Sequence, residues 1–210
     1  MKHFQLRFDR RAAFLLSEFH RLAANPEADR FKKWRLQEGL ISSAWQAWSG
    51  FCRSTLLASA AGTTSASGKA VSSSFAAYTE PELCFIALQF ARKHRLSKIA
   101  SVRGMYEEPT WGDFSKAGLI ANGFASTNVK QLTSSLGAAS LSLDLQHVRN
   151  ACAHISRDGI GNIKGMRVRY GSTTFIHPSD TVFWIDRATN DWAFKAWIYE
   201  LQSIANKACL

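Results

Sequence analysis

The sequence predicts a mainly α-helical bundle, with a small β-hairpin or meander inserted between its last two helices. Apolar residues recur at helical spacing over long segments early and late in the chain. Between residues 159 and 187, glycines separate short alternating runs that are typical of strands. The chain is 46% hydrophobic with 7 Trp and 14 Phe, so it can bury a sizeable core. We expect its 210 residues to form a single domain.

The first third of the chain predicts two helices followed by a loop. Asp9 to Ala24 form the first helix, and a longer one runs from Pro26, in its first turn, to about Ala60. A run of small and polar residues follows and predicts a flexible loop at about residues 61–75. Its glycines are not a phosphate-binding loop, because Ala70 stands where that motif requires Ser or Thr.

Three further helical regions are expected before the glycine-rich segment. Thr79 is the N-cap of a helix that continues to about His94. Gly118 and Gly123 are expected to break the next region into short helical pieces. The helix Ala138–Ser156 comes last and carries the motif described below.

The β excursion is expected at about residues 160–187. Its strands are predicted at Ile163–Tyr170, Thr173–His177 and Thr181–Ile185, where apolar and polar residues alternate. A final helix, Trp192–Lys207, closes the bundle with one apolar stripe.

Charge and cysteine content limit the partners and the compartment. The formal net charge of +10 favours a polyanionic partner such as nucleic acid. The four cysteines, Cys52, Cys84, Cys152 and Cys209, form no CxxC pair and have no metal-ligand spacing with a histidine. We therefore expect no metal, no cofactor, and thiols in a reducing cytoplasm. No signal peptide or membrane segment is expected.

The residues that suggest chemistry lie near the end of the expected motif helix. Arg149 and Asn150 precede three small residues, Ala151 to Ala153, and His154 follows directly. A guanidinium group can hold a phosphate, and an imidazole titrates near neutral pH. These two groups suffice to cleave RNA without a metal. An arginine or histidine on a helix is, however, also common as a purely structural residue.

The run R-N-x-x-A-H at residues 149–154 resembles the signature of the HEPN superfamily, many of whose members are ribonucleases. The resemblance implies a bundle of about four or five helices with the motif late in the chain. It also implies a homodimer with a composite site at the interface. Some HEPN toxins have a tyrosine two residues after the histidine, which a partner nucleotidyltransferase modifies. Here that residue is Ser156, so we infer no such partner.

Helix geometry agrees with a dimeric site. Arg149 and His154 are five residues apart, which is about 140° around an ideal helix, so they do not share a face. If two motif helices meet across a two-fold axis, two arginines and two histidines converge. We further expect that Asp144 pairs with Arg149 in the resting state.

The residues and the resemblance together predict a metal-independent endoribonuclease, and the resemblance implies that it acts as a toxin or in defence against phage. Its catalytic residues would be Arg149, His154 and Asn150, and its partners an RNA substrate, a second copy of the chain, and an antitoxin or defence-complex subunit. One alternative is a non-catalytic interaction or dimerisation module in such a complex. Another is a basic DNA-binding protein, although no helix-turn-helix signature supports it.

A few other residues allow two interpretations. His177 precedes a proline and is expected in a turn, although a catalytic role is an alternative. The basic runs Arg30–Arg35, Arg92–Arg95 and Arg167–Arg169 either track an RNA backbone or face solvent. Trp45 and Trp48 either stack on bases or, as we expect, pack in the core.

Overall fold

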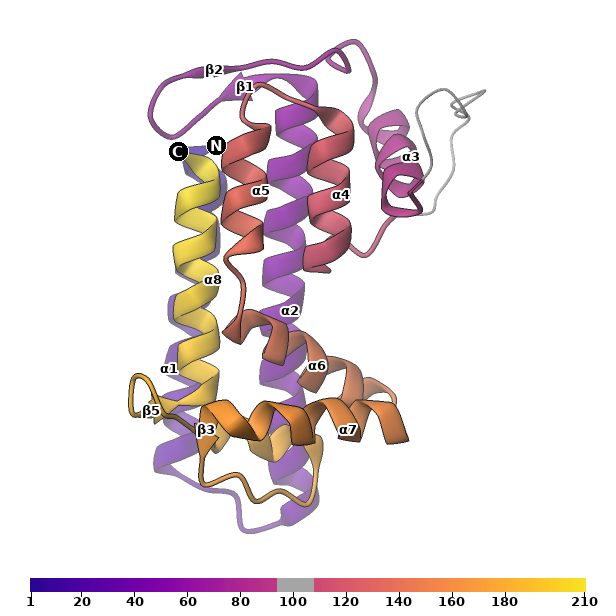
Figure 1. Cartoon of the computed structure of the whole chain (residues 1–210). Coiled ribbons are helices and arrows are strands. Elements are labelled where there is room, and N and C mark those ends of the chain that lie inside the picture. Colours follow the sequence, from indigo (N-terminus) through magenta and orange to yellow (C-terminus); the bar gives the residue numbers. More distant parts are fainter. Residues whose placement is uncertain (94–107) are drawn as a thin grey trace. The chain divides into compact units, whose positions relative to one another are not determined.

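The computed structural model describes residues 1–93 and 108–210, and this part of the chain is mainly α-helical, as predicted (Figure 1). It also contains two small antiparallel sheets, with strand orders β1-β2 and β3-β4-β5. The helices are α1 (Lys2–Ala24), α2 (Arg30–Ala61), α3 (Glu80–Ala91), α4 (Phe114–Phe124), α5 (Val129–Gly137), α6 (Leu141–Ala153), α7 (Arg157–Met166), η2 (Arg167–Arg169), η3 (Pro178–Phe183) and α8 (Ala193–Cys209). The strands are β1 (Thr63–Thr64), β2 (Ala70–Val71), β3 (Tyr170–Gly171), β4 (Ile185–Asp186) and β5 (Asp191–Trp192).

The chain divides into two compact units, and each is assembled from separate stretches of sequence. Unit 1 consists of residues 1–8, 48–139 and 203–210, and unit 2 of residues 9–47 and 140–202. The chain passes from one unit to the other within α1, α2 and α8. A single domain over the whole chain stays a prediction.

The core of unit 1 is built around Trp48. Its ring stacks on Phe51 and Phe114, with centroids 5.5 and 5.2 Å away. Its indole N–H donates to the carbonyl of Gly112 at 3.0 Å, so the buried polar group has a partner. Trp48 is fully buried and Trp45, in unit 2, nearly so, which confirms the packing interpretation for both.

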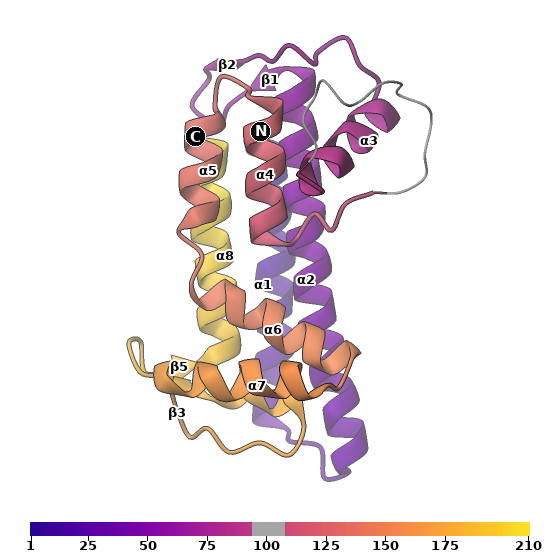
Figure 2. The same ribbon diagram turned by 45° about the vertical axis from the view of Figure 1, so that its right-hand side comes forward.

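The region 114–137 differs from the expectation of short helical pieces. Gly118 and Gly123 lie inside one continuous helix, α4, which pairs with α5 through a short connection (Figure 2). Gly123 is there because α3 approaches closely. A Cβ at this position would lie 2.3 Å from two ring atoms of Phe90. The glycine therefore permits close helix packing and does not end the helix.

Residues 61–75, expected to be a flexible loop, contain the β1-β2 hairpin. Thr63 pairs with Val71 and Thr64 with Ala70. Gly62 has φ +93°, a conformation that L side chains rarely adopt, and this allows the chain to leave α2 and turn into β1.

The core of unit 2 gathers aromatic rings around Phe19 of α1. Its ring stacks on Phe194 of α8 at 5.0 Å and meets Trp192 edge-on at 5.3 Å. α6 and α7 pack together in this unit, and α6 also contacts η3. The packing thereby fixes the helix that carries the motif.

The β excursion is confirmed as a three-stranded antiparallel sheet near α8, but its strands are shorter and placed differently. Tyr170 pairs with Asp186, and Ile185 with Trp192. The strand predicted at Ile163–Tyr170 is wrong, because α7 and η2 occupy nearly all of it. Ile163 and Met166 are the buried positions of α7 and lie three residues apart. This spacing is typical of a helix, whereas buried residues alternate in a strand.

The other two strand predictions are also corrected. Residues 173–177 form no strand, and residues 178–183 form the 3-10 helix η3. Proline at the start of η3 and the cap by His177 favour a tight helical turn there. In the described part of the chain, no helix is both long and apolar enough to cross a membrane.

Candidate functional site

The helix α6 is held by its buried side and presents the motif at its C-terminal end. Leu145, Val148 and Ala151 are fully buried and recur at a spacing of three residues. This spacing places them along one side of the helix, which packs into unit 2. The same packing orients the residues that lie between them.

The N-terminal end of α6 is fixed by a carboxylate of α8. Glu200 accepts hydrogen bonds from the backbone N–H groups of Ser140 at 3.1 Å and Ser142 at 2.6 Å, and from both hydroxyls. Burial raises the pKa of Glu200, but these hydrogen bonds outweigh it, so the pKa lies below its ordinary value. The charged carboxylate thus satisfies free N–H groups where the helix dipole favours an anion.

Asp144 does not pair with Arg149, so that prediction is wrong. The fully buried carboxylate of Asp144 accepts two hydrogen bonds from Arg169 and one from the Tyr170 hydroxyl at 2.7 Å. Asp144 lies on the buried side of α6, and Arg149 is five residues further on, about 140° around the helix.

This buried network continues into α8 and anchors the centre of α6. The indole N–H of Trp197 donates to the Tyr170 hydroxyl at 2.8 Å. Burial, and then the neighbouring Asp144, raise the pKa of Tyr170, so the phenol keeps its proton. We assign this network a structural role, because its members satisfy one another's hydrogen bonds.

The three predicted catalytic residues lie at and just beyond the exposed end of α6. Arg149 is half-buried, and its guanidinium donates to the side-chain oxygen of Asn150 at 3.1 Å. Among the described residues, no carboxylate forms an ion pair with Arg149. Asn150 and His154 are exposed.

His154 is the residue at which α6 ends. Its backbone N–H donates to the carbonyl of Asn150 at 2.9 Å, but its φ of −142° and ψ of 89° are not helical. The ideal-helix angle of about 140° therefore no longer fixes the direction of its ring relative to Arg149.

Ser156, two residues after His154, has a local structural role. Its hydroxyl accepts a hydrogen bond from the backbone N–H of Gly159 at 3.1 Å and caps α7. His154 thus lies in a two-residue joint between the end of α6 and the cap of α7. This joint leaves the imidazole accessible.

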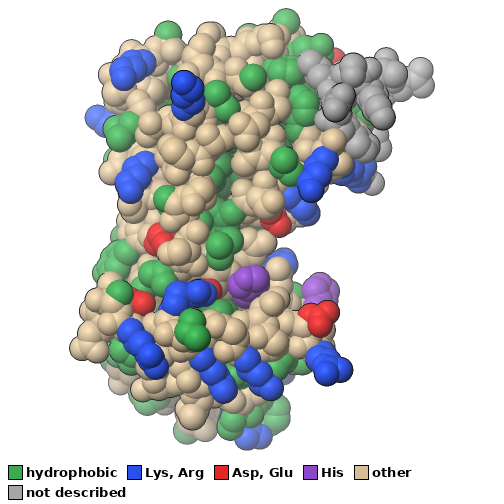
Figure 3. All heavy atoms as spheres, in the orientation of Figure 1, with side chains coloured by type: hydrophobic (Ala, Val, Ile, Leu, Met, Phe, Trp, Pro, Cys, Tyr) green, Lys and Arg blue, Asp and Glu red, His purple; other side chains and the backbone are tan. Residues whose placement is uncertain are grey.

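An open groove of about 460 Å³ begins directly after His154. Arg157 and Lys164 supply its positive charge, and both are exposed. Figure 3 shows lysine and arginine side chains gathered on the surface over α7. The groove is lined by Ile155, Ser156, Arg157, Ile160, Gly161 and Lys164.

Two of the predicted basic runs, Arg30–Arg35 and Arg167–Arg169, are partly engaged within unit 2, and the run Arg92–Arg95 extends beyond the described residues. Arg30 lies over the ring of Trp34 at 5.0 Å, and Lys33 pairs with Asp180 at 3.5 Å. Arg169 is held by Asp144, whereas Arg167 lies over Phe175 at 5.3 Å. Apart from Arg149, the cations nearest in sequence to His154 are Arg157 and Lys164 of α7.

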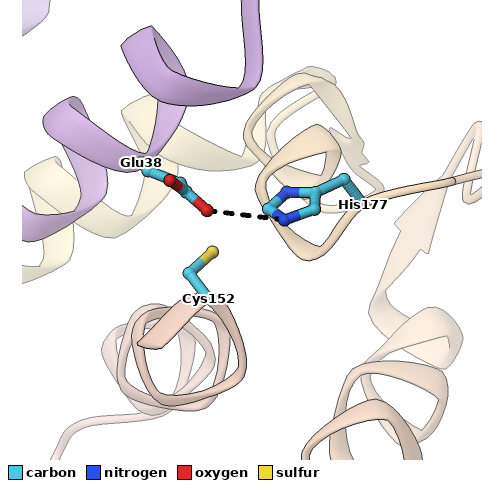
Figure 4. Close-up of side chains that lie close together, drawn as sticks. All are labelled: Glu38, Cys152 and His177. Atoms are coloured by element: carbon cyan, nitrogen blue, oxygen red, sulfur yellow. Dashed lines mark ion pairs between the residues drawn. The ribbon is translucent and has the colours of Figure 1, made fainter. Parts of the chain in front are cut away.

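A second group of chemically active side chains meets at Cys152, inside the motif. Glu38 of α2, Cys152 of α6 and His177 each offer one ligand atom, and these atoms lie within 4.8 Å of one another (Figure 4). The Glu38 carboxylate lies 3.4 Å from Nε2 of His177. Burial, followed by Glu38 and Asp180, raises the pKa of Cys152 to about 12, which argues against a thiolate nucleophile.

His177 is in a turn, as expected, and is firmly held there. The carboxylate of Asp180 accepts its backbone N–H at 3.0 Å, and its ring stacks on Trp34 at 4.8 Å. Its Nδ1 lies 2.9 Å from the hydroxyl of Ser179. The Glu38–Cys152–His177 cluster escaped the sequence analysis because its members are far apart in the sequence, and only the fold brings them together.

Comparison with known proteins adds no relative: no protein family, no curated protein and no solved structure matches this chain. Its fold places it among mainly α proteins. The resemblance to HEPN proteins stays a prediction from residues 149–154.

Proposed function

We propose that this protein is a metal-independent endoribonuclease of the HEPN type, which acts as a homodimer in a toxin or an anti-phage defence system. The observation that carries the proposal is the placement of Arg149, Asn150 and His154 at the exposed end of a helix whose opposite side is buried. A nucleic-acid substrate can reach all three residues.

Charge and shape near His154 support an RNA substrate. The guanidinium of Arg149 has no carboxylate partner among the described residues, so it is available to a phosphate. The adjoining groove adds Arg157 and Lys164, and the net charge of +10 attracts polyanions.

In the proposed reaction, the RNA 2′-hydroxyl attacks the adjacent phosphorus and the bond to the 5′-oxygen breaks. His154 of one protomer takes the proton of the hydroxyl. The partner subunit's His154, or water, donates a proton to the departing 5′-oxygen. Arg149 stabilises the charge that builds on the phosphate, and Asn150 orients the groups around it. The products carry a 2′,3′-cyclic phosphate and a 5′-hydroxyl.

The joint after α6 suits a composite site. Ala153 and Ile155 flank His154, and both are exposed, Ile155 with 68% of its surface accessible. Small and apolar side chains around an accessible imidazole permit the close approach of a second copy.

A second candidate function is a non-catalytic interaction module in a toxin–antitoxin or defence complex. The exposed apolar side chains of unit 2 favour it. Val168 and Ile176 are each 73% accessible, in addition to Ile155. Exposed aliphatic groups of this kind suit a protein partner.

The test is incubation of the purified chain with total RNA in EDTA. We expect cleavage by the wild type and a loss of about 10²- to 10⁴-fold in rate for His154→Ala. Arg149→Ala should also lose cleavage, because phosphate stabilisation is lost. His3→Ala and Arg10→Ala are matched controls, since both residues are exposed and lie outside the motif.

Mass spectrometry of the RNA ends and sedimentation of the protein complete the experiment. Cyclic-phosphate ends and a dimer support the proposal. Equal cleavage by the wild type and by folded His154→Ala contradicts it. No cleavage by any of the proteins favours the interaction module.

A further inference from the structure

The cluster at Cys152 lies outside the proposed catalytic groups and has the chemistry of a metal site. It combines a thiol, an imidazole and a carboxylate, the three ligand types that Zn²⁺ takes in proteins. The cluster belongs entirely to unit 2, so its geometry depends on one compact part of the chain.

The distances agree with a tetrahedral ion. Zn²⁺ binds sulfur at about 2.3 Å and nitrogen or oxygen at about 2.0–2.2 Å, so ligand atoms lie about 3.3–3.8 Å apart. The Glu38 oxygen and the His177 Nε2 are 3.4 Å apart. The Cys152 sulfur lies within 4.8 Å of both, and a shift of about 1 Å or less brings it into range.

Hydrogen bonds behind His177 hold its ring so that Nε2 faces Glu38. The hydroxyl of Ser179 donates to the amide oxygen of Gln37 at 2.9 Å, and Gln37 is fully buried. The backbone N–H of Ser179 donates to Nδ1 of His177 at 3.3 Å, and the Ser179 hydroxyl lies 2.9 Å from the same atom. Nε2, the ring nitrogen on the opposite side, faces the Glu38 oxygen at 3.4 Å and is the atom that an ion would contact.

We propose that Glu38, Cys152 and His177 form a Zn²⁺ site that fastens the last turn of α6 to α2 and to the start of η3. Water completes the coordination. Cys152 binds as thiolate, and its proton passes to solvent. The ion stabilises the turn from which His154 projects and takes no part in RNA cleavage, so this proposal is independent of the proposed function.

The probe is Zn²⁺ alone, added to the full chain after removal of metals, in competition with a chromophoric chelator. We expect one Zn²⁺ per chain and a melting temperature that rises with Zn²⁺. Co²⁺ in the same site should show thiolate-to-metal charge-transfer absorption. Cys152→Ser should abolish that absorption, and Glu38→Gln should weaken Zn²⁺ binding by about tenfold or more.

Two controls separate this site from other features of the chain. Cys84→Ser replaces a thiol of unit 1 and should leave the absorption unchanged. His154→Ala should lose RNA cleavage and keep Zn²⁺ binding, so failure of one proposal is distinguishable from failure of the other. Glu38→Gln keeps a polar group of similar size at a half-buried position, so it tests the site even if Cys152→Ser does not fold. Absence of Zn²⁺ binding by the wild type overturns the proposal. So does Zn²⁺ binding by Glu38→Gln and Cys152→Ser that is as tight as that of the wild type.

Discussion

Two glycine-to-alanine substitutions on α4 should have opposite effects on stability. In a helix, alanine is favoured over glycine by about 1 kcal/mol. At Gly118 the new Cβ meets nothing within 4 Å, so Gly118→Ala should stabilise by about this amount. At Gly123 it meets Cγ and both Cδ atoms of Phe90 at 2.3–2.7 Å.

The contact at Gly123 is costly because of where it falls on the phenyl ring. Cγ lies on the χ2 axis, so flipping the ring does not move it, and either χ1 of Phe90 must change or α3 and α4 must separate. Overpacking of this kind costs about 1–3 kcal/mol. After the helical gain of about 1 kcal/mol, Gly123→Ala should be neutral or destabilise by up to about 2 kcal/mol.

Urea unfolding, followed by circular dichroism and tryptophan fluorescence, measures both variants. In thermal unfolding, Gly118→Ala should raise Tm by about 2–4 °C. In the Phe90→Ala background, Gly123→Ala should instead stabilise, because alanine lacks the Cγ and Cδ atoms that make the contact. If both substitutions stabilise equally, the close approach of Phe90 to Gly123 is refuted.

Two further predictions concern the anchors of α6. Tyr170→Phe should destabilise the folded state by about 1–3 kcal/mol, because it leaves the buried indole N–H of Trp197 without an acceptor and the Asp144 carboxylate without one donor. Urea unfolding measures this loss, and an unchanged unfolding midpoint contradicts the prediction. The folded-state pKa of Glu200 is depressed, so its stabilisation is complete above the unfolded pKa of about 4.3 and is lost as pH falls through the folded pKa. Glu200→Gln should therefore show a shallower acid-induced loss of Tm than the wild type, and identical pH profiles contradict the assignment.

The sequence predicts the helices well where apolar periodicity is long and uninterrupted. The segments 9–24 and 192–207 fall almost entirely within α1 and α8, because their stripes face a core. Glycine misled the prediction in two places. Position 123 is a glycine because the Phe90 ring of another helix packs against it. The helix α7 contains several glycines, whose low helix propensity predicts a loop or strand. Such tertiary effects leave no local signal.

The motif could be located from sequence, but its surroundings could not. The order Arg149, Asn150 and His154 is visible in the chain, whereas the end of α6 at Ala153 depends on how the next helix is capped. The true partner of Asp144 is Arg169, 25 residues later, and Glu38 reaches Cys152 only in the folded unit. Contacts between residues so far apart in the sequence depend on tertiary packing, which the spacing of residues in a single sequence does not reveal.

The interleaving of the two units along the chain has a consequence for synthesis. Phe19 is made early, yet the ring on which it stacks, Phe194, is added 175 residues later. The N-terminal end of α6 likewise lacks its hydrogen-bond acceptor until Glu200 has been synthesised. Neither unit can complete its core until α8 has left the ribosome, so the nascent chain exposes apolar surface while the residues before α8 are made.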